Sequence, residues 1–533
     1  MPVDDLPDAS ATPLTTSRSD AEILATAKGG GFLVGGTFFA FAVRFLIALV
    51  LARSLGAAQY GLYVLAISAA TLVSGISLVG LDDAMVRYVA IYLGRKDQEG
   101  IGGALQIGVG VGTVLGLLSG AILFVLAQPI AVDVFHTPAL EPLLKLFAFV
   151  VPFLSLSNTL LGTARGFKRM DYAAYSEKGV QSLVRLGLVV ILWLPGWLTV
   201  KSAAVAFALS DVASSIVLIM LLNRIYPMER VLQRGQRRDT RAIFHFAIPL
   251  WMSGLLRQFR RNIQKVMLGA LATVAAVGIF SIANTITLVA GVAAGAIYVA
   301  SRPLFAQQHD RGDKHALGAL YKATTRWSLV LYMPFFLIMV LYPSQLLHVF
   351  GQEFTAGAAA LVIVSFSQLA DAATGTCQGM IDMTGHTRAK LANAILYTVL
   401  LVGSGWLLIP PYGLIGAAWS AVIAEVGVNG VSLAEVWFFE HLFPFDRTFW
   451  KPGLAALIAY AAGLGLRQVH PGGGGIIAVG AQSVLIMGLF AGLLLLFRLE
   501  PEDRMIIDSA LAKLGKRLRR GGDASSDVGS VVE

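Results

Sequence analysis

The chain has 533 residues, of which 56% are hydrophobic and only 14% are charged, whereas soluble domains carry about 25% charged residues. This balance excludes an ordinary soluble protein and predicts an all-α protein that crosses a membrane many times. The net charge of +9 does not indicate a nucleic-acid partner, because Lys and Arg gather in short segments between apolar runs. The single cysteine, Cys377, excludes disulfides within the chain and any cysteine-based metal site.

Fourteen apolar runs are long enough to cross a bilayer as helices. About 20 residues are needed, because the hydrocarbon core is about 30 Å thick and a helix rises ~1.5 Å per residue. Residues 1–28 have no basic stretch directly before a short apolar core, so we expect the first run to be an uncleaved anchor. The predicted spans are 31–52, 61–81, 101–127, 143–164, 179–198, 202–222, 243–268, 276–301, 323–343, 357–380, 391–409, 413–437, 452–470 and 475–498.

The distribution of Lys and Arg predicts how these spans are oriented. If the fourteen spans alternate in direction, most of the 41 Lys and Arg residues face the side of the N-terminus. Positively charged loops stay in the cytoplasm, so we expect both termini there. The basic C-terminal tail would contact anionic lipid or serve as a solvated topology signal. The connections on the side of the membrane opposite the N-terminus would hold only Arg53, Lys145, Lys201 and Arg467.

An internal repeat predicts two similar halves. Three pairs of segments match at nearly the same offset: GTARG (162–166) with GTCQG (375–379), GLYVLA (61–66) with GIFSIA (278–283), and SAAVAFALSD (202–211) with GAAWSAVIAE (416–425). Each half would hold six spans, an even number, so the halves share one orientation and are related by an axis along the membrane normal. The predicted organisation is a cytoplasmic tail (1–30), an N-lobe (31–222), a basic cytoplasmic linker (223–242), a C-lobe (243–440), helices 13 and 14 (452–498) and a basic cytoplasmic tail (499–533).

The stretch WMSGLLRQFRRNIQKVMLGAL (251–271) places four cations inside a predicted span. Arg257, Arg261 and Lys265 follow at i, i+4 and i+8 and so share one helix face, with Arg260 beside them. Burying one such cation in a bilayer costs about 3 kcal/mol, so we expect the face to line a wet cavity. Arg44, midway along the first span, is the matching feature of the first half. In the alternative, the helix ends early and leaves Arg260, Arg261 and Lys265 at the outer interface.

Three carboxylates also fall within predicted spans. The repeat aligns Asp211 with Glu425, and it aligns Asp371 with Asn158. Intramembrane carboxylates face a cavity or a partner, so we expect an ion-coupling or gating role, with packing between helices as the alternative. Asp82 and Asp83 form a pair without a glycosyltransferase context. Catalytic, phosphate-binding and metal-binding motifs are missing from the sequence, so we expect neither an enzyme nor a cofactor.

Five segments carry a family resemblance: LARSLGAAQYGLYVLA (51–66), GLDDAMVRYVA (80–90), GTARGFKRMDYAAY (162–175), FAIPLWMSGLLRQFRRNIQKVMLG (246–269) and VGIFSIA (277–283). Over roughly residues 30–440, the chain resembles the oligosaccharide (polysaccharide) flippases of the O-antigen flippase type. That family belongs to the multidrug/oligosaccharidyl-lipid/polysaccharide exporter superfamily. The resemblance implies two six-helix lobes around a central cationic cavity. It also implies alternating access that moves an undecaprenyl-pyrophosphate-linked oligosaccharide across the bacterial inner membrane.

The resemblance further implies roles for residues and partners. Arg44, Arg257, Arg260 and Arg261 would bind pyrophosphate or acidic sugar, and Lys265 shares their helix face. Asp371 and Glu425 would couple or gate transport, with H+ or Na+ as the coupling ion. The expected partners are the lipid-linked oligosaccharide, membrane lipids, a polysaccharide polymerase and a chain-length regulator. The product would be lipopolysaccharide, capsule or exopolysaccharide. Gln264 departs from the pattern, because many relatives are expected to carry an acidic residue there.

Four other functions remain open from the sequence. A drug or cation antiporter of the same superfamily would need a carboxylate-rich cavity, whereas Arg and Lys dominate the charges within these spans. A lipid II flippase would have a cationic cavity of similar chemistry. A membrane glycan polymerase or ligase would need a large periplasmic loop, and the longest predicted external connection is only about 128–142. A scaffold within a polysaccharide assembly complex is the fourth.

Overall fold

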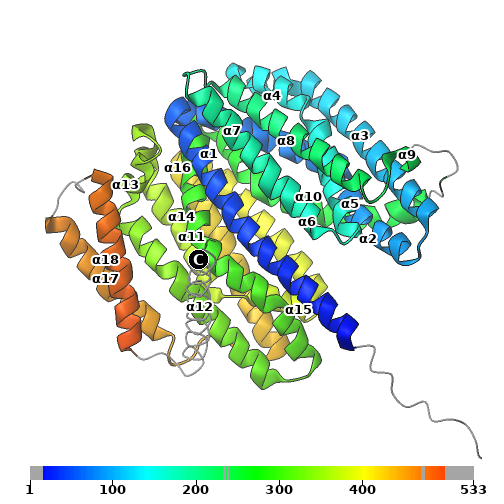
Figure 1. The fold of residues 1–533 in the computed structure, drawn as a ribbon. Helices are drawn as coiled ribbons and strands as arrows, with labels where there is room; N and C mark the ends of the chain where they lie inside the picture. The colour runs from blue at the N-terminus through cyan, green and yellow to red at the C-terminus, as the bar shows by residue number, and fades with distance from the viewer. Residues whose placement is uncertain (1–15, 232–235, 237–238, 470–474, 498–533) are drawn as a thin grey trace, which may run out of the picture. The chain divides into compact units, whose positions relative to one another are not determined.

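A computed structural model describes residues 16–231, 236, 239–469 and 475–497 (Figure 1). Within these ranges the chain forms helices and no strand, which confirms the all-α prediction. In the same ranges, eight helices are long and apolar enough to cross a membrane, or nine if one bent pair counts as a single span. The chain is therefore a multi-pass membrane protein, and the number of fourteen spans stays a prediction. The predicted tail at 499–533, and the first half of the tail at 1–30, lie outside the described residues.

The chain divides into two compact units, and the first comprises residues 1–55 and 62–262. The lobe boundaries inferred from the repeat stay a prediction. Within the first unit, α2 packs against both α3 and α5. Its helical elements are most of α1 (Thr16–Leu78), α2 (Leu81–Gly94), α3 (Gln98–Pro129), η1 (Ile130–Val134), η2 (Pro138–Leu140), α4 (Glu141–Ala148), α5 (Val151–Gly166), α6 (Met170–Ala174), η3 (Tyr175–Val180), α7 (Gln181–Trp193), α8 (Val200–Asn223), α9 (Met228–Val231) and the first part of α10 (Thr240–Leu271).

Two glycines allow the helices around α2 to approach closely. Gly80, with φ 74°, precedes α2, and a Cβ there would lie 2.2 Å from the carbonyl oxygen of Ala247 on α10. A Cβ at Gly162 on α5 would lie 2.2 Å from the carbonyl oxygen of Asp82 on α2. Only glycine fits such backbone-to-backbone contacts, so these two positions fix where the first turn of α2 lies. Apolar residues of α2, α3, α5, α8 and α10 form the core around it, including Leu81, Met85, Leu105, Leu160, Leu218 and Ile243.

The second unit comprises residues 56–61 and 263–533. Its core brings α11, α12, α15 and α16 together around Phe305, Tyr321, Met380 and Val436. Cys377 is buried in this core, with 1% of its surface exposed. The helical elements of this unit are the end of α10, α11 (Val274–Asp310), α12 (Lys314–Leu341), α13 (Pro343–His348), η4 (Gln352–Gly357), α14 (Ala358–Thr374), α15 (Cys377–Met383), α16 (Thr387–Glu440), α17 (Trp450–Val469) and α18 (Gly475–Leu496).

Two very long helices are each bent at a glycine. Helix α1 has a non-helical residue at Gly56, and α16 has one at Gly413, so each consists of two helical pieces. After the first bend, Gly56–Gly61 belongs to the second unit. There the carboxylate of Glu353 accepts a hydrogen bond of 2.8 Å from the backbone N–H of Ala57. Glu353 therefore caps the N-terminus of the second piece of α1.

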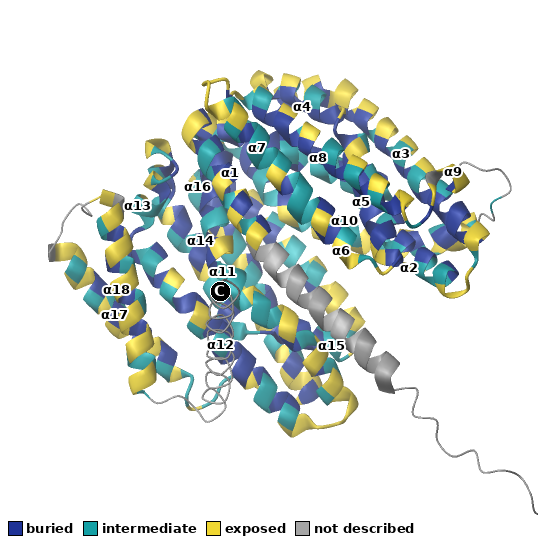
Figure 2. Cartoon of the chain, viewed as in Figure 1, coloured by how far each residue is buried: buried dark blue, intermediate teal, exposed yellow. Residues whose placement is uncertain are grey.

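Outward-facing helix surfaces are apolar, as expected of lipid-facing surfaces. Figure 2 shows many exposed positions along α3 and α18. Val125 on α3 is 73% exposed, and Val484 on α18 is 68% exposed. A soluble monomer rarely exposes contiguous apolar surface of this kind, which agrees with a membrane location for both units.

Candidate functional site

The first unit brings four of the predicted binding cations together. Arg44 on α1 and Arg257 and Arg261 on α10 are exposed, and Arg260 is half-buried. The charges of Arg44, Arg257 and Arg260 all act on Arg261, and the charge of Glu177 opposes them. Two helices far apart in the sequence thus form one positively charged region, which we call the arginine cluster. The role of these residues in binding stays a prediction.

Lys265, the fifth predicted cation, lies in the part of α10 that belongs to the second unit. It is half-buried. Next to it, the side-chain amide of Gln264 donates a hydrogen bond of 2.6 Å to the carbonyl oxygen of Ala417 and one of 3.3 Å to the hydroxyl of Ser420. An acidic residue in place of Gln264 would have no N–H to donate to this carbonyl. The departure from the expected acidic residue therefore has a local structural reason.

A cavity of about 150 Å³ in the first unit includes Arg257 in its lining. Two hydrogen bonds of 3.1 Å hold α10 against α1 at the wall of this cavity. Trp251 Nε1 donates to the carbonyl oxygen of Gly75, and Gln258 Nε2 donates to the carbonyl oxygen of Thr71. Asp82 and Asp83 also line it, and the charges of Asp82 and Arg257 attract each other. The polar lining residues are Thr71, Ser74, Asp82, Asp83, Asn158, Trp251, Arg257 and Gln258.

Asp211 lies in a separate, buried polar network of the first unit. Its side chain is 1% exposed, and Oδ1 accepts a hydrogen bond of 2.8 Å from Gln181 Nε2. Oδ2 has no hydrogen-bond partner among the described residues. Nearby, Arg185 Nε donates to the hydroxyl of Ser210 at 3.0 Å, and its guanidinium stacks 4.0 Å from the ring centre of Phe207. The charge of Arg185 acts on Asp211, so this carboxylate is partly compensated.

The other two predicted carboxylates lie in one network of the second unit. Asp371 on α14 accepts a hydrogen bond of 3.0 Å from Gln368 Nε2. Glu425 on α16 faces Asn429 Nδ2 at 3.5 Å, and Asn429 is also a hydrogen-bonding neighbour of Asp371. Gln378 Nε2 completes the network by donating to Asn429 Oδ1 at 2.7 Å. Asn429 therefore connects two carboxylates that come from different helices.

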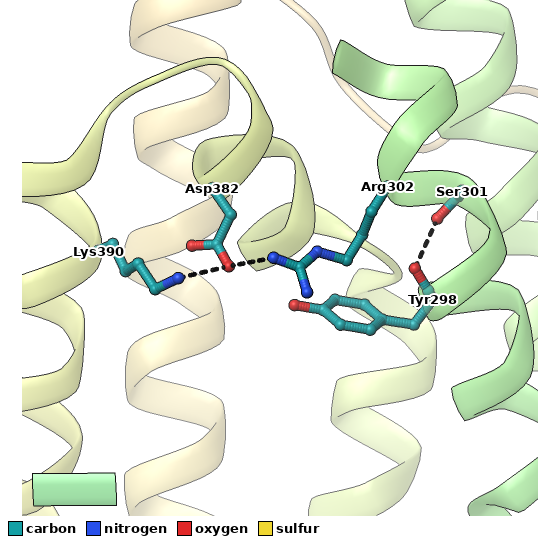
Figure 3. Close-up of polar contacts among 5 residues, drawn as sticks. All are labelled: Tyr298, Ser301, Arg302, Asp382 and Lys390. Carbon is teal, nitrogen blue, oxygen red and sulfur yellow. Dashed lines mark hydrogen bonds and ion pairs between the residues drawn. The ribbon is translucent and has the colours of Figure 1, made fainter. Parts of the chain in front are cut away.

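The second unit also contains a charged cluster that we did not predict from the sequence (Figure 3). Asp382 Oδ2 accepts a hydrogen bond of 2.9 Å from Lys390 Nζ and lies 3.5 Å from Arg302 Nη2. Arg302 also lies beside the ring of Tyr298, 5.8 Å from its centre. A signal was present in the repeat, because Asp382 closely follows GTCQG as Asp171 closely follows GTARG.

Asp171 is likewise paired, in the first unit. Arg169 donates two hydrogen bonds to it, of 2.9 Å from Nε and 2.7 Å from Nη2. These bonds, together with the charge of Arg169, hold the pKa of Asp171 below its usual range, although partial burial opposes the shift. Each unit thus has a carboxylate–arginine pair just after its copy of the repeated glycine motif.

Two family models match long segments of the chain. The model of the polysaccharide biosynthesis protein family matches residues 26–309, and the MatE model matches residues 249–407. Stage V sporulation protein B of Bacillus subtilis (strain 168) is 28% identical over 200 residues. This match covers 37% of the chain and spans only 38% of the length of that relative.

Solved structures share the fold at low sequence identity. The lipid II flippase MurJ in an inward closed conformation is 12% identical, with a TM-score of 0.68 over 86% of this chain and 98% of its own. An inward-facing multidrug resistance MATE family transporter of the MOP superfamily is 17% identical, with a TM-score of 0.62 over 74% of this chain and 94% of its own. These proteins are described as a flippase and a transporter.

The matched family model covers more than half of the chain, and the structural matches cover both units. The chain is therefore a multi-pass membrane protein that belongs to the polysaccharide biosynthesis protein family and has the fold of the MOP superfamily.

Proposed function

We propose that this protein flips a polyprenyl-pyrophosphate-linked oligosaccharide across the bacterial inner membrane by alternating access. The glycan would supply lipopolysaccharide, including O-antigen, capsule or exopolysaccharide. The observation that carries this proposal is the arginine cluster of α1 and α10, in a chain of the polysaccharide biosynthesis protein family. Both termini would face the cytoplasm, and a polymerase and a chain-length regulator would act on the flipped glycan.

The arginine cluster suits a pyrophosphate headgroup. Guanidinium groups pair bidentately with phosphate oxygens, and such charge-assisted bonds are about twice as strong as neutral ones. Without an anion, the like charges of Arg44, Arg257, Arg260 and Arg261 repel one another, so an anionic ligand relieves an existing strain. Lys265 would extend the cationic face along α10. The arginine cluster would repel a cationic drug, which disfavours the antiporter alternative.

The carboxylate network of the second unit suits a coupling ion. Asp371 and Glu425 share Asn429, so binding of H+ or Na+ at either carboxylate changes the hydrogen bonds available to the other. Asp211 in the first unit is a second candidate, because its buried Oδ2 has no hydrogen-bond partner among the residues described. A proton or a cation would compensate its charge.

Transfer of a fluorescent polyprenyl-pyrophosphate oligosaccharide between the leaflets of reconstituted vesicles tests the proposal. We expect transport by the wild type under a proton or sodium gradient and a loss of at least about tenfold, or about 1.4 kcal/mol, in Arg257→Ala and Arg261→Ala. Arg241→Ala is the matched control, because Arg241 is an exposed arginine in the first turn of α10. Equal rates in all variants would refute the role of the cluster. Preferential transport of lipid II in the same vesicles would favour the lipid II flippase instead.

A further inference from the structure

The cavity beside Arg257 contains a buried hydroxyl without a partner. Ser74 is 3% exposed and lines the cavity, yet its Oγ has no hydrogen-bond partner in the described part of the chain. Leaving a buried polar group unpaired is unfavourable, and such groups generally bond to something. The hydroxyl of Ser74 is therefore available to a polar molecule bound in this cavity.

The size of the cavity limits what that ligand can be. Its volume of about 150 Å³ is several times the share of one water molecule, about 30 Å³. It is also smaller than the roughly 300–1,000 Å³ of pockets for drug-sized molecules. A single sugar ring fits between these limits, whereas a complete oligosaccharide does not.

The lining combines hydrogen-bond donors and acceptors, which suits a polyol. Asp82 and Asp83 supply acceptors, and Arg257 supplies donors to the same cavity. Two carboxylates and one guanidinium give the lining a net negative charge, which disfavours an anion. A bare cation is attracted by the carboxylates, but it offers no acceptor to the N–H groups of Arg257. Each hydroxyl of a sugar both donates and accepts a hydrogen bond, so a sugar can use both kinds of group at once. Trp251 adds an aromatic surface for the apolar parts of the ring.

The lining is also held in place before any ligand arrives. The hydrogen bonds of Trp251 and Gln258 to the backbone of α1 fix the α10 side of the cavity. The glycine contacts at Gly80 and Gly162 fix the first turn of α2, which carries both carboxylates. A site that is already ordered loses less entropy when it binds.

We propose that this cavity binds one sugar residue of the lipid-linked glycan, with Asp82, Asp83 and Ser74 as hydrogen-bonding partners of its hydroxyls. This inference rests on the proposed function, because it assigns the pyrophosphate to the arginine cluster and the sugar to the cavity that shares Arg257. It gives the paired aspartates a binding role and predicts that the protein discriminates between headgroups with and without sugar.

Cysteine labelling tests binding without requiring transport. The chain has one cysteine, so Cys377→Ala provides a background for Ser74→Cys and for the control Glu99→Cys, which is exposed on α3 and outside the lining. The probe is the glycan released by mild acid from the polyprenyl-linked pool of the producing cells. We expect it to slow thiol labelling of S74C at least fivefold, with no effect on E99C. Protection by sodium or by inorganic pyrophosphate alone, or no protection by the glycan, would overturn the sugar site.

Vesicle transport provides a second readout, which tests the sugar site even if the thiol reagent does not label S74C. The rate for the glycan-bearing lipid is divided by the rate for a sugar-free polyprenyl pyrophosphate. We expect this ratio to fall at least tenfold in Asp82→Asn/Asp83→Asn, with Asp133→Asn, an exposed residue of η1, as the control. An unchanged ratio would overturn the sugar site and leave the flippase standing. If the wild type moves neither lipid, the proposed function fails, and protection of S74C alone decides whether the cavity binds sugar.

Discussion

Replacing Gly162 with alanine should destabilise the first unit, because the added Cβ meets backbone rather than a flexible side chain. An ideal Cβ at this position lies 2.2 Å from the carbonyl oxygen and 2.9 Å from the carbonyl carbon of Asp82. Both distances are below 3.0 Å, the limit that real Cβ atoms respect, so α5 and α2 must separate by several tenths of an ångström. Overpacking of this kind costs about 1–3 kcal/mol, whereas alanine gains at most about 1 kcal/mol in helix propensity.

The net expectation is a loss of up to about 2 kcal/mol in the free energy of unfolding, from the difference of these two effects. The control is Gly110→Ala on α3. Apart from its own chain neighbours and the nearby backbone of its own helix, no described atom lies within 4 Å of an added Cβ there. That variant should be neutral or slightly more stable than the wild type. Unfolding in mixed micelles by titration with SDS measures all three proteins. If Gly162→Ala unfolds at the same SDS fraction as Gly110→Ala, the close contact between α5 and α2 is wrong.

Three further predictions concern single contacts. Asp171 has a lowered pKa, so its pair stabilises the fold above the unfolded pKa of about 3.9 and is lost as pH falls further. Because Asp171 is exposed, the effect is a fraction of a kcal/mol. Asp171→Asn should therefore weaken the pH dependence of the melting temperature below pH 4. Gln264→Glu should destabilise more than Gln264→Ala in SDS titration, because a carboxylate facing the Ala417 carbonyl repels it. Glu353→Ala should lower the melting temperature, because the loss of a helix cap costs about 0.5–2 kcal/mol of stability. Glu353→Gln keeps an acceptor and should lose less stability.

Helical spacing predicted the arginine cluster only in part. The i, i+4, i+8 pattern placed Arg257, Arg261 and Lys265 on one face of α10, and Arg44 was added because it lies midway along the first span. Within the first unit, the charges of Arg44, Arg257 and Arg260 do act on Arg261. Lys265 belongs to the second unit, because the division falls between Asn262 and Ile263, in the middle of the helix. Periodicity describes one helix and holds no information about where its packing partners change.

The paired aspartates show a second limit of sequence reasoning. Asp82 and Asp83 lie in a segment that carries the family resemblance, but no binding or catalytic motif surrounds them, so their local pattern did not indicate a site. Their cavity exists because α2 and α10 approach at Gly80, where a side chain would collide with the backbone of Ala247. A glycine before a helix is common, and a sequence does not specify which distant helix it admits. The same holds for Asp382, whose two cationic partners come from α11 and α16.

The repeat explains how one fold can provide two kinds of polar site. It aligned Asn158 with Asp371, and each of these residues lies four positions before a copy of the GTxxG motif. In the first unit, Asn158 lines a cavity that already contains two carboxylates and an arginine. In the second unit, Asp371 belongs to a network of amides and one further carboxylate. A neutral amide at the first position adds no charge to a site proposed for a polyol, whereas a carboxylate at the second supplies the charge that a proton or cation requires. Under the proposed function, the duplicated position has diverged toward substrate in one half and toward the coupling ion in the other.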